Sequence, residues 1–392
     1  MIPVMNITRQ YASVQEELDR TALEVLHSGN YILGNIVSKF EKEFAEYCGV
    51  KYAIGVANGT DALVIALEAC GIGQGDEVIT TAMTFVATVE AIVRVGAKPV
   101  LVDIDKTTYN IDVTKIESVI RENTKAIIPV HIYGQIADMD KINEIASNHG
   151  LKVIEDCAQA AGAKYNGKRA GSFGDVACIS FFPTKNLGAA GDGGMILTSD
   201  EDIFKRCQAY RAHGSGINGA YTMSKLNGDN FDENQLDFQG NLPKYYNYVV
   251  GYNSRLDALQ AALLSVKLKY LDSWNERRRE VARVYNAEIS NSKIGKITIK
   301  NMDEHIFYVY PIKVEKRDEF REYMKQNGVA TGVYFPVPMH MQECFGYLGY
   351  KKGDFPVTED WSEHMVTIPM FPELTKDELE DILIAINLYG QK

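Results

Sequence analysis

One lysine stands in a setting suited to covalent chemistry with a carbonyl group. Lys185 lies in SFFPTKNLGAAGDGG (180–194), between a strand-like apolar run and a cluster of glycines. Glycines let a backbone approach a planar ligand closely. Apolar neighbours disfavour the ammonium form, which leaves the amine able to attack a carbonyl carbon. The alternative interpretation is a surface lysine in a turn, which describes most lysines.

An aspartate at the end of a second strand-like run is the natural partner of this lysine. Asp156 closes the apolar run in VIEDCAQAAGA (153–163), so its carboxylate should lie partly buried at the strand's carboxyl end. A helix N-cap is the competing interpretation. Together, a strand-end aspartate and a recessed lysine form the arrangement that pyridoxal phosphate requires. The lysine holds the aldehyde covalently, and the aspartate keeps the pyridine nitrogen protonated.

A third segment, ANGTDAL (57–63), predicts an anion site. Gly59 and Thr60 follow a strand and open a helix, where free N–H groups and the helix dipole favour a phosphate. Helix capping alone would also explain Thr60 or Asp61. Ser180 could supply a hydroxyl to the same phosphate. Phe85 could stack on the ring, although core packing is the ordinary interpretation of a phenylalanine.

Strand-like and helix-like patterns alternate from about residue 40 to residue 205 and would position these side chains. Such alternation predicts a parallel sheet covered by helices on both faces, with ligands at the carboxyl ends of the strands. The expected strands are 51–56, 77–81, 98–104, 126–134 and 152–156, and the expected helices between them are 60–70, 84–95 and 138–149.

Beyond residue 213 the pattern changes twice. Residues 214–250 are polar, rich in Gly and Asn, and aperiodic, which predicts a long loop insertion. Residues 254–289 read as one long helix or two joined helices. Short strands near 305–314, 330–335 and 365–370, with helices at 316–327 and 376–389, then predict a small α/β domain. We therefore expect a large domain over residues 1–255 and a small one over residues 256–392.

Composition excludes several classes of function. The net charge of −11 disfavours binding to nucleic acid. Charges interrupt every stretch of 18 residues, which argues against a membrane span. The six cysteines form no Cys-x-x-Cys pair, so we expect reduced thiols in a cytoplasmic protein and no metal site.

The chain resembles a known family. IGVANGTDAL, TFVAT, PVHIYGQIADMD, IEDCAQAAGA, SFFPTKNLGAAGDGG and GYNSRLDALQAA are similar to motifs of the DegT/DnrJ/EryC1/StrS aminotransferases. The resemblance implies a fold-type I architecture, with a large three-layer α/β/α domain, a mostly parallel sheet and a smaller C-terminal α/β domain. It also implies that Lys185 carries pyridoxal phosphate, Asp156 pairs with the ring nitrogen and Gln159 contacts the ring hydroxyl. The remaining cofactor contacts implied are Gly59, Thr60, Asp61 and Ser180 at the phosphate, Phe85 on the ring, and Asn253 from the other subunit of a homodimer.

By the same resemblance, the reaction moves the amino group of L-glutamate to a nucleotide-linked keto sugar, with pyridoxamine phosphate as the intermediate form. The resemblance of the HIYGQIADMD segment favours a 3-keto over a 4-keto sugar as the substrate. YFPVPMH (334–340) resembles a family segment near the sugar, so Tyr334 and His340 are candidate substrate contacts, with a packed histidine as the alternative. A sugar dehydratase and a non-catalytic regulator on the same fold are the rival functions. The presence of Lys185, Asp156 and Gln159 argues against both.

Overall fold

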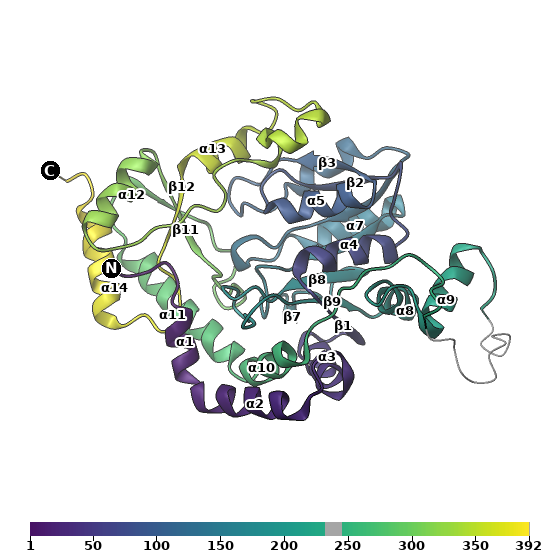
Figure 1. Cartoon of the computed structure of the whole chain (residues 1–392). Coiled ribbons are helices and arrows are strands. Elements are labelled where there is room, and N and C mark those ends of the chain that lie inside the picture. Colours follow the sequence, from purple (N-terminus) through teal and green to yellow (C-terminus); the bar gives the residue numbers. More distant parts are fainter. Residues whose placement is uncertain (232–244, 392) are drawn as a thin grey trace.

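A computed structural model of the chain describes residues 1–231 and 245–391. Its centre is a seven-stranded sheet of strand order β1-β9-β8-β5-β4-β2-β3 (Figure 1). All neighbours pair in parallel except β9, which runs antiparallel to both β1 and β8. The predicted mostly parallel sheet is confirmed. The strands are β1 (Tyr52–Val56), β2 (Glu77–Thr81), β3 (Lys98–Val102), β4 (Thr124–Ile128), β5 (Lys152–Asp156), β8 (Val176–Ser180) and β9 (Gly194–Thr198).

Helices cover both faces of this sheet. Within each strand, successive apolar side chains enter opposite cores, as Ala53 and Ile54 do in β1. One face is covered by α4 (Gly59–Ala69), α5 (Val86–Arg94) and α8 (Glu201–Tyr210), and the other by α3 (Gly34–Cys48) and α7 (Met139–His149). At the lower edge of Figure 1, α10 (Ala258–Leu268) packs against α3, and α2 (Gln15–Ser28) packs against α10. The result is the three-layer arrangement expected from the alternating pattern.

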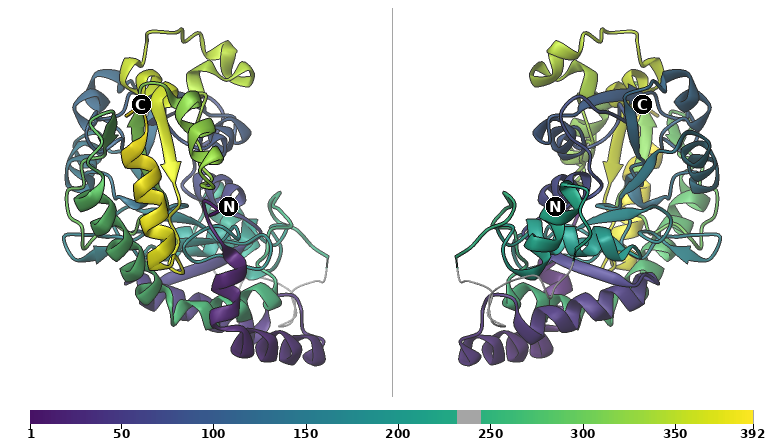
Figure 2. Two further views of the ribbon diagram at one scale, coloured as in Figure 1. Left: turned by 90° about the vertical axis from the view of Figure 1, so that its left-hand side faces the viewer. Right: turned by 90° about the vertical axis from the view of Figure 1, so that its right-hand side faces the viewer.

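A second, antiparallel sheet of order β10-β11-β12 lies beside the first. Its strands are β10 (Ile294–Lys296), β11 (Tyr310–Val314) and β12 (Met365–Ile368), and it packs with α11 (Leu271–Glu288), α12 (Arg317–Gln326) and α14 (Lys376–Leu388). Figure 2 shows α14 alongside the strands of this sheet. The N-terminal segment joins the same region, because Ile2 bridges to Val329. A division of the chain after residue 255 stays a prediction.

The shorter elements connect these layers. They are α1 (Ile7–Ser13), α6 (Val113–Ile116), α9 (Gly216–Leu226), α13 (Pro356–His364), the small hairpin of β6 (Lys164–Tyr165) and β7 (Lys168–Arg169), and the short 3-10 turns η1 (Glu117–Val119), η2 (Ile132–Gly134), η4 (Met339–Met341) and η5 (Glu343–Leu348). Among the described residues, no helix combines the length and the apolar character needed to cross a bilayer.

Two expectations about local structure are wrong. Part of the predicted loop insertion forms α9, whose small residues Gly219, Ala220 and Thr222 are buried beside α8. Small side chains give little hydrophobic periodicity, which is why the pattern hid this helix. The middle of that insertion, residues 232–244, lies outside the described residues. The strand expected near residues 330–335 is only a bridge from Gly332 to Thr367. The ladder does not continue, because the Tyr334 N–H donates to the side-chain sulfur of Met365 and not to a backbone carbonyl.

A buried carboxylate forms hydrogen bonds that join α13 to the edge of the large sheet. Asp103, just after β3, accepts hydrogen bonds from the backbone N–H of Thr358 at 2.9 Å, the hydroxyl of Thr358 at 2.8 Å and the N–H of Val357 at 3.2 Å. Burial opposes ionisation, but hydrogen bonds from Thr358 and neighbouring N–H groups outweigh it and lower the pKa of Asp103. The charged form therefore stabilises the contact between the two parts of the chain.

Replacing this carboxylate should weaken the protein in a pH-dependent way. We expect Asp103→Asn to reduce the free energy of unfolding at pH 7 by about 1–3 kcal/mol, since a charged acceptor is lost. Because the folded pKa lies below the unfolded one, the wild-type advantage is full above about pH 4 and is lost as pH falls through the folded pKa. Thermal unfolding midpoints of both proteins between pH 3 and 8 measure this. Exposed Asp318→Asn is the control, and a difference that persists unchanged at pH 3 contradicts the account.

Candidate active site

A cavity of about 450 Å³ opens at the carboxyl-end edge of the large sheet. The edge is shared by the ends of β1, β5 and β8 and by the start of β9, since Gly194 pairs with both Val56 and Ser180. The wall is completed by Tyr308, Tyr334 and Phe335. They belong to the part of the chain that carries the antiparallel sheet β10-β11-β12, called here the second region. Of the side chains and backbone positions predicted from sequence, the cavity brings together Gly59, Thr60, Phe85, Asp156, Gln159, Ser180, Lys185 and Tyr334.

Lys185 projects from the loop between β8 and β9. The loop is held by backbone hydrogen bonds from Phe181 to Gly193 and from Ala189 to Phe181. The Lys185 Nζ lies 4.4 Å from the centre of the Tyr308 ring, against the cavity wall. Burial lowers the pKa of Lys185 to about 8, although the charge of Asp156 acts in the opposite direction. The amine is thus largely neutral at a mildly alkaline pH, as a nucleophile for a carbonyl must be.

Asp156 is buried at the end of β5 with both carboxylate oxygens occupied. Oδ2 accepts from the Thr88 hydroxyl at 2.8 Å, and Oδ1 accepts from the Ala158 N–H at 3.1 Å. Thr88 in turn is 2.7 Å from the Thr84 hydroxyl. Residues 157–162 form turns rather than a helix, so the helix N-cap interpretation of Asp156 is wrong. The carboxylate is oriented for a ligand in the cavity.

The anion site at the start of α4 is organised by Asn58. Its Oδ1 accepts from the Asp61 N–H at 2.8 Å, so Asn58 is the N-cap and neither Thr60 nor Asp61 fills that role. The first N–H groups of the helix have no carbonyl partner within it, and Gly59 and Thr60 line the cavity. A Cβ on Gly59 would lie 2.8 Å from the Ser180 Cβ, which makes glycine a requirement there. Thr60 and Ser180 line the cavity beside this helix end.

These features fit pyridoxal phosphate. The helix end supplies N–H donors and hydroxyls for a phosphate, Asp156 supplies a fixed carboxylate, and Lys185 supplies a recessed amine. The side chain of Phe85 is 55% exposed and lines the cavity, with its ring centre 5.6 Å from that of Phe335. It is therefore not a core residue, and it is free to cover one face of a planar ring.

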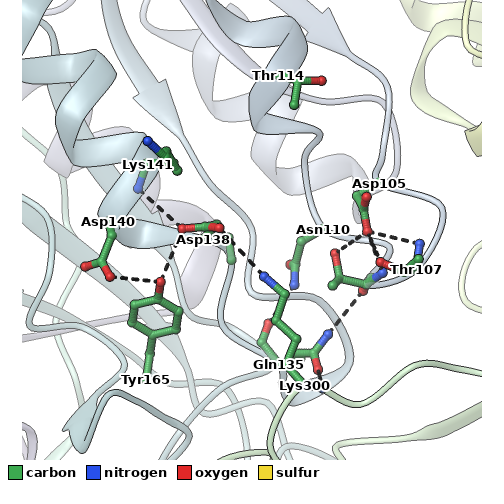
Figure 3. A network of polar contacts seen from close by, with 12 residues as sticks. Asp105, Thr107, Asn110, Thr114, Gln135, Asp138, Asp140, Lys141, Tyr165 and Lys300 are labelled. Carbon is green, nitrogen blue, oxygen red and sulfur yellow. Dashed lines mark hydrogen bonds and ion pairs between the residues drawn. The ribbon is translucent and has the colours of Figure 1, made fainter.

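Gln159 is positioned by the loop between β4 and α7. Its Oε1 accepts from the Tyr133 N–H at 2.7 Å, which turns its amide nitrogen away from Tyr133. The loop itself is anchored by Gln135, whose carbonyl accepts from Asn110 and whose side chain contacts the backbone of Thr108 and Lys300. Figure 3 shows this network together with Lys300 and Asp138, which form an ion pair at 3.7 Å. The polar residues Gln135 and Asp138 of HIYGQIADMD therefore fix the loop and are not among the residues that line the cavity.

Three predicted site residues lie outside the lining of this cavity. Asp61 faces a neighbouring open cleft with Arg94 and Tyr252. Asn253 is exposed, next to its bridge with Ala212. His340 is buried, with Nε2 2.9 Å from a Glu359 oxygen, so the structure agrees with the packed-histidine alternative for this residue.

Several residues of the site were not identified from sequence. Thr88 lies in the first turn of α5, four residues after Thr84, which precedes the helix. That spacing could have suggested that the two hydroxyls bond to each other. Tyr308 and Phe335 come from the second region and carry no signal of their own. Their placement depends on how the two parts of the chain pack.

A buried polar cluster lies directly behind Asp156. Glu155 accepts from His131 Nε2 at 2.9 Å and from the N–H groups of Gly171, Phe173 and Gly174. Burial opposes its charge, but His131 and these N–H groups outweigh burial and lower the pKa of Glu155. Cys157 lies near enough to complete a candidate metal triad with His131 and Glu155. Since two donors already occupy each carboxylate oxygen of Glu155, we interpret the cluster as a support for the end of β5.

Comparison with known proteins identifies the family. The profile of the DegT/DnrJ/EryC1/StrS aminotransferase family matches residues 12–387. The chain is 47% identical to the pleiotropic regulatory protein of Geobacillus stearothermophilus, over 98% of this chain and 97% of that protein. It is 44% identical to the dTDP-3-amino-3,6-dideoxy-alpha-D-galactopyranose transaminase of Aneurinibacillus thermoaerophilus, over the whole of both chains.

Solved structures agree with this assignment. S. venezuelae DesV, in complex with a ketimine intermediate, superimposes with a TM-score of 0.91 at 34% identity and covers 100% of this chain and 99% of its own. NtdA from Bacillus subtilis, with bound PMP, gives a TM-score of 0.81 at 31% identity over 95% of this chain and 81% of its own. The predicted cofactor is thus the one found in a solved structure that shares this fold. The chain belongs to the DegT/DnrJ/EryC1/StrS aminotransferase family.

Proposed function

We propose that this protein uses pyridoxal phosphate to transfer the amino group of L-glutamate to a nucleotide-linked keto sugar. The observation that carries the proposal is the pairing, in one cavity, of Lys185 with its pKa lowered to about 8 and the doubly hydrogen-bonded carboxylate of Asp156. The similarity to the Aneurinibacillus thermoaerophilus transaminase over the full chain supports the substrate class.

The cofactor would be held at both ends. The N–H groups at the start of α4, with the hydroxyls of Thr60 and Ser180, bind the phosphate. Asp156 would keep the proton on the pyridine nitrogen, the Gln159 amide nitrogen would be available to the ring hydroxyl, and Phe85 would cover the ring. Pyridoxal phosphate supplies, when bound, a carbonyl carbon that exchanges amino groups and a ring that draws electrons from the adjacent carbon.

Lys185 has two tasks in this scheme. Its amine would hold the cofactor covalently until the amino group of L-glutamate takes its place. The freed Nζ would then hold or release a proton beside the reacting carbon, because a pKa of about 8 keeps both its acidic and its basic form accessible near neutral pH. The same Nζ would serve the keto-sugar half of the reaction.

A 3-keto sugar is the substrate that we favour over a 4-keto sugar. The name of the Aneurinibacillus thermoaerophilus relative specifies amination at carbon 3. The family resemblance of the HIYGQIADMD segment favours the same substrate, although its polar residues Gln135 and Asp138 do not line the cavity.

We further propose a homodimer in the cytoplasm. Asn253 is exposed and outside the cavity of its own chain, which suits a contact with the phosphate of a partner subunit. The open cleft with Asp61 and Arg94, beside the start of α4, offers the route for it. The cysteines of the chain are free thiols, as in a reducing compartment.

Purified holoenzyme tests the function with two substrates in turn. L-Glutamate should bleach the visible absorbance of the bound cofactor, and a screen of dTDP- and UDP-linked 3-keto and 4-keto sugars should then yield an amino sugar with stoichiometric 2-oxoglutarate. A sugar dehydratase would consume sugar without 2-oxoglutarate. A regulator without catalytic activity would show no bleaching.

Removing the carboxylate charge of Asp156 should leave a folded but slow enzyme. We expect Asp156→Asn to retain cofactor and to lose kcat on the order of 100-fold or more, since the ring proton is no longer stabilised. Steady-state 2-oxoglutarate production measures this. Asp175→Asn, which changes a carboxylate held by Lys152 and Val153 away from the cavity, is the control. Near-normal turnover in Asp156→Asn would leave Asp156 a structural residue.

The pH dependence of cofactor binding should report the pKa of Lys185. Because only the neutral amine attacks the aldehyde, the rate of covalent cofactor uptake by the apoenzyme should rise about tenfold per pH unit below 8 and level off above it. Stopped-flow absorbance between pH 6 and 10 measures the rate. A rate that climbs steadily to pH 10 would mean an ordinary lysine pKa and would contradict the assignment.

A further inference from the structure

One buried residue outside the cavity contacts three of the residues that line it. Tyr133 lies in the short turn η2 (Ile132–Gly134) between β4 and α7 and is 1% exposed. Its φ of 59° places it in the left-handed region, which is uncommon for a bulky residue. A tyrosine stays in that conformation only where its surroundings hold it there.

The backbone of Tyr133 joins two walls of the cavity. Its N–H donates to Gln159 Oε1 at 2.7 Å, and its carbonyl accepts from the Tyr308 N–H at 3.0 Å. The neighbouring Gly134 carbonyl accepts from Ile306 at 3.1 Å, so the turn runs against the Tyr308 segment. Tyr308 faces the amine of Lys185. The backbone of one residue thus sets Gln159 and Tyr308 relative to each other.

The hydroxyl of Tyr133 contacts a third part of the cavity wall. It donates to the Tyr334 carbonyl at 2.6 Å and accepts from Trp361 Nε1 at 2.9 Å. Trp361 is buried and stacks on Tyr109, with 3.6 Å between ring centres. Tyr334 lines the cavity and packs its ring against Tyr308. A hydroxyl that donates one bond and accepts another in a dry environment has a fixed orientation.

The geometry points to Tyr133 as a positioning residue for the keto-sugar substrate. This inference rests on the proposed function, in which the cofactor occupies the start of α4 and the space above Asp156. The wall of Tyr334 and Phe335 is then what remains for a second substrate. L-Glutamate is small and reacts close to Lys185, whereas a nucleotide sugar must extend along that wall. Loss of the Tyr133 hydroxyl should therefore weaken sugar binding selectively.

Tyr133→Phe removes the hydroxyl and keeps both backbone contacts. With dTDP-3-amino-3,6-dideoxy-α-D-galactose as the amino-sugar probe, we expect KM to rise at least about tenfold while kcat changes less than about threefold. Cofactor loading and the single-turnover rate with L-glutamate should stay within about twofold of the wild type. An unchanged KM for the amino sugar, or an equal loss with both substrates, would overturn the inference.

Tyr285→Phe is a matched control. Tyr285 is fully buried in the second region, and its hydroxyl donates to the Pro369 carbonyl at 2.7 Å. It therefore loses the same kind of bond without touching the cavity. Both variants should lower the thermal unfolding midpoint, but only Tyr133→Phe should raise the KM. An equal rise of KM in both would reduce Tyr133 to a purely structural role.

A readout without activity separates this inference from the proposed function. Crystal structures of cofactor-free wild type and Tyr133→Phe should differ in the position of Tyr334, with Gln159 in place. If the wild type accepts no nucleotide sugar, the proposed function fails, and a displaced Tyr334 still supports the positioning role. An undisplaced Tyr334 overturns it. Should Tyr133→Phe not fold, Trp361→Phe removes the donor to the same hydroxyl, and a smaller rise of KM is expected.

Discussion

Two opposite electrostatic requirements meet in the cavity at the edge of the large sheet. Lys185 must be able to lose its proton, and Asp156 must carry a negative charge a short distance away. Burial satisfies the first requirement by lowering the pKa of the lysine, and hydrogen bonds from Thr88 and Ala158 orient the carboxylate for the second. The charge of Asp156 partly opposes the lowering of the Lys185 pKa, so this pKa depends on the spacing between the two side chains.

The sheet fixes that spacing. Asp156 ends β5, and Lys185 leaves the adjacent β8 through a loop that returns as β9. The first residue of β9 must be glycine, because a Cβ on Gly194 would lie 2.3 Å from the Asn58 carbonyl oxygen. Behind β5, Glu155 ties the strand end to His131 and to the turn at residues 171–174. The relative position of Lys185 and Asp156 therefore depends on the backbone of β5, β8 and β9 and on the buried cluster behind β5.

Much of this region could be predicted from sequence. The alternation of apolar runs located five of the seven strands of the large sheet, and the apolar run before Lys185 marked the end of a sixth, β8. Strand ends with a lysine, an aspartate and a Gly-Thr helix start indicated the cofactor site. The antiparallel course of β9 was not evident, because direction leaves no mark on a short apolar run. Helix α9 was hidden by its small buried residues.

Most of the far wall of the cavity was beyond reach of the sequence. The family resemblance pointed to Tyr334, but Tyr308 and Phe335 were not identified, because only tertiary packing brings the second region opposite Lys185. Tyr133 shows the same limit more strongly, since its contacts with Gln159, Tyr308 and Tyr334 join segments far apart in the chain. Local patterns report on burial and on secondary structure, whereas such contacts depend on how distant elements meet.

Chemical trapping of the cofactor tests the central assignment most directly. The holoenzyme is reduced with sodium borohydride, digested, and its peptides are mapped by mass spectrometry. The account predicts a phosphopyridoxyl label on the peptide that contains Lys185, and no label in a folded Lys185→Ala variant treated in the same way. A label on any other lysine of the wild type would contradict it.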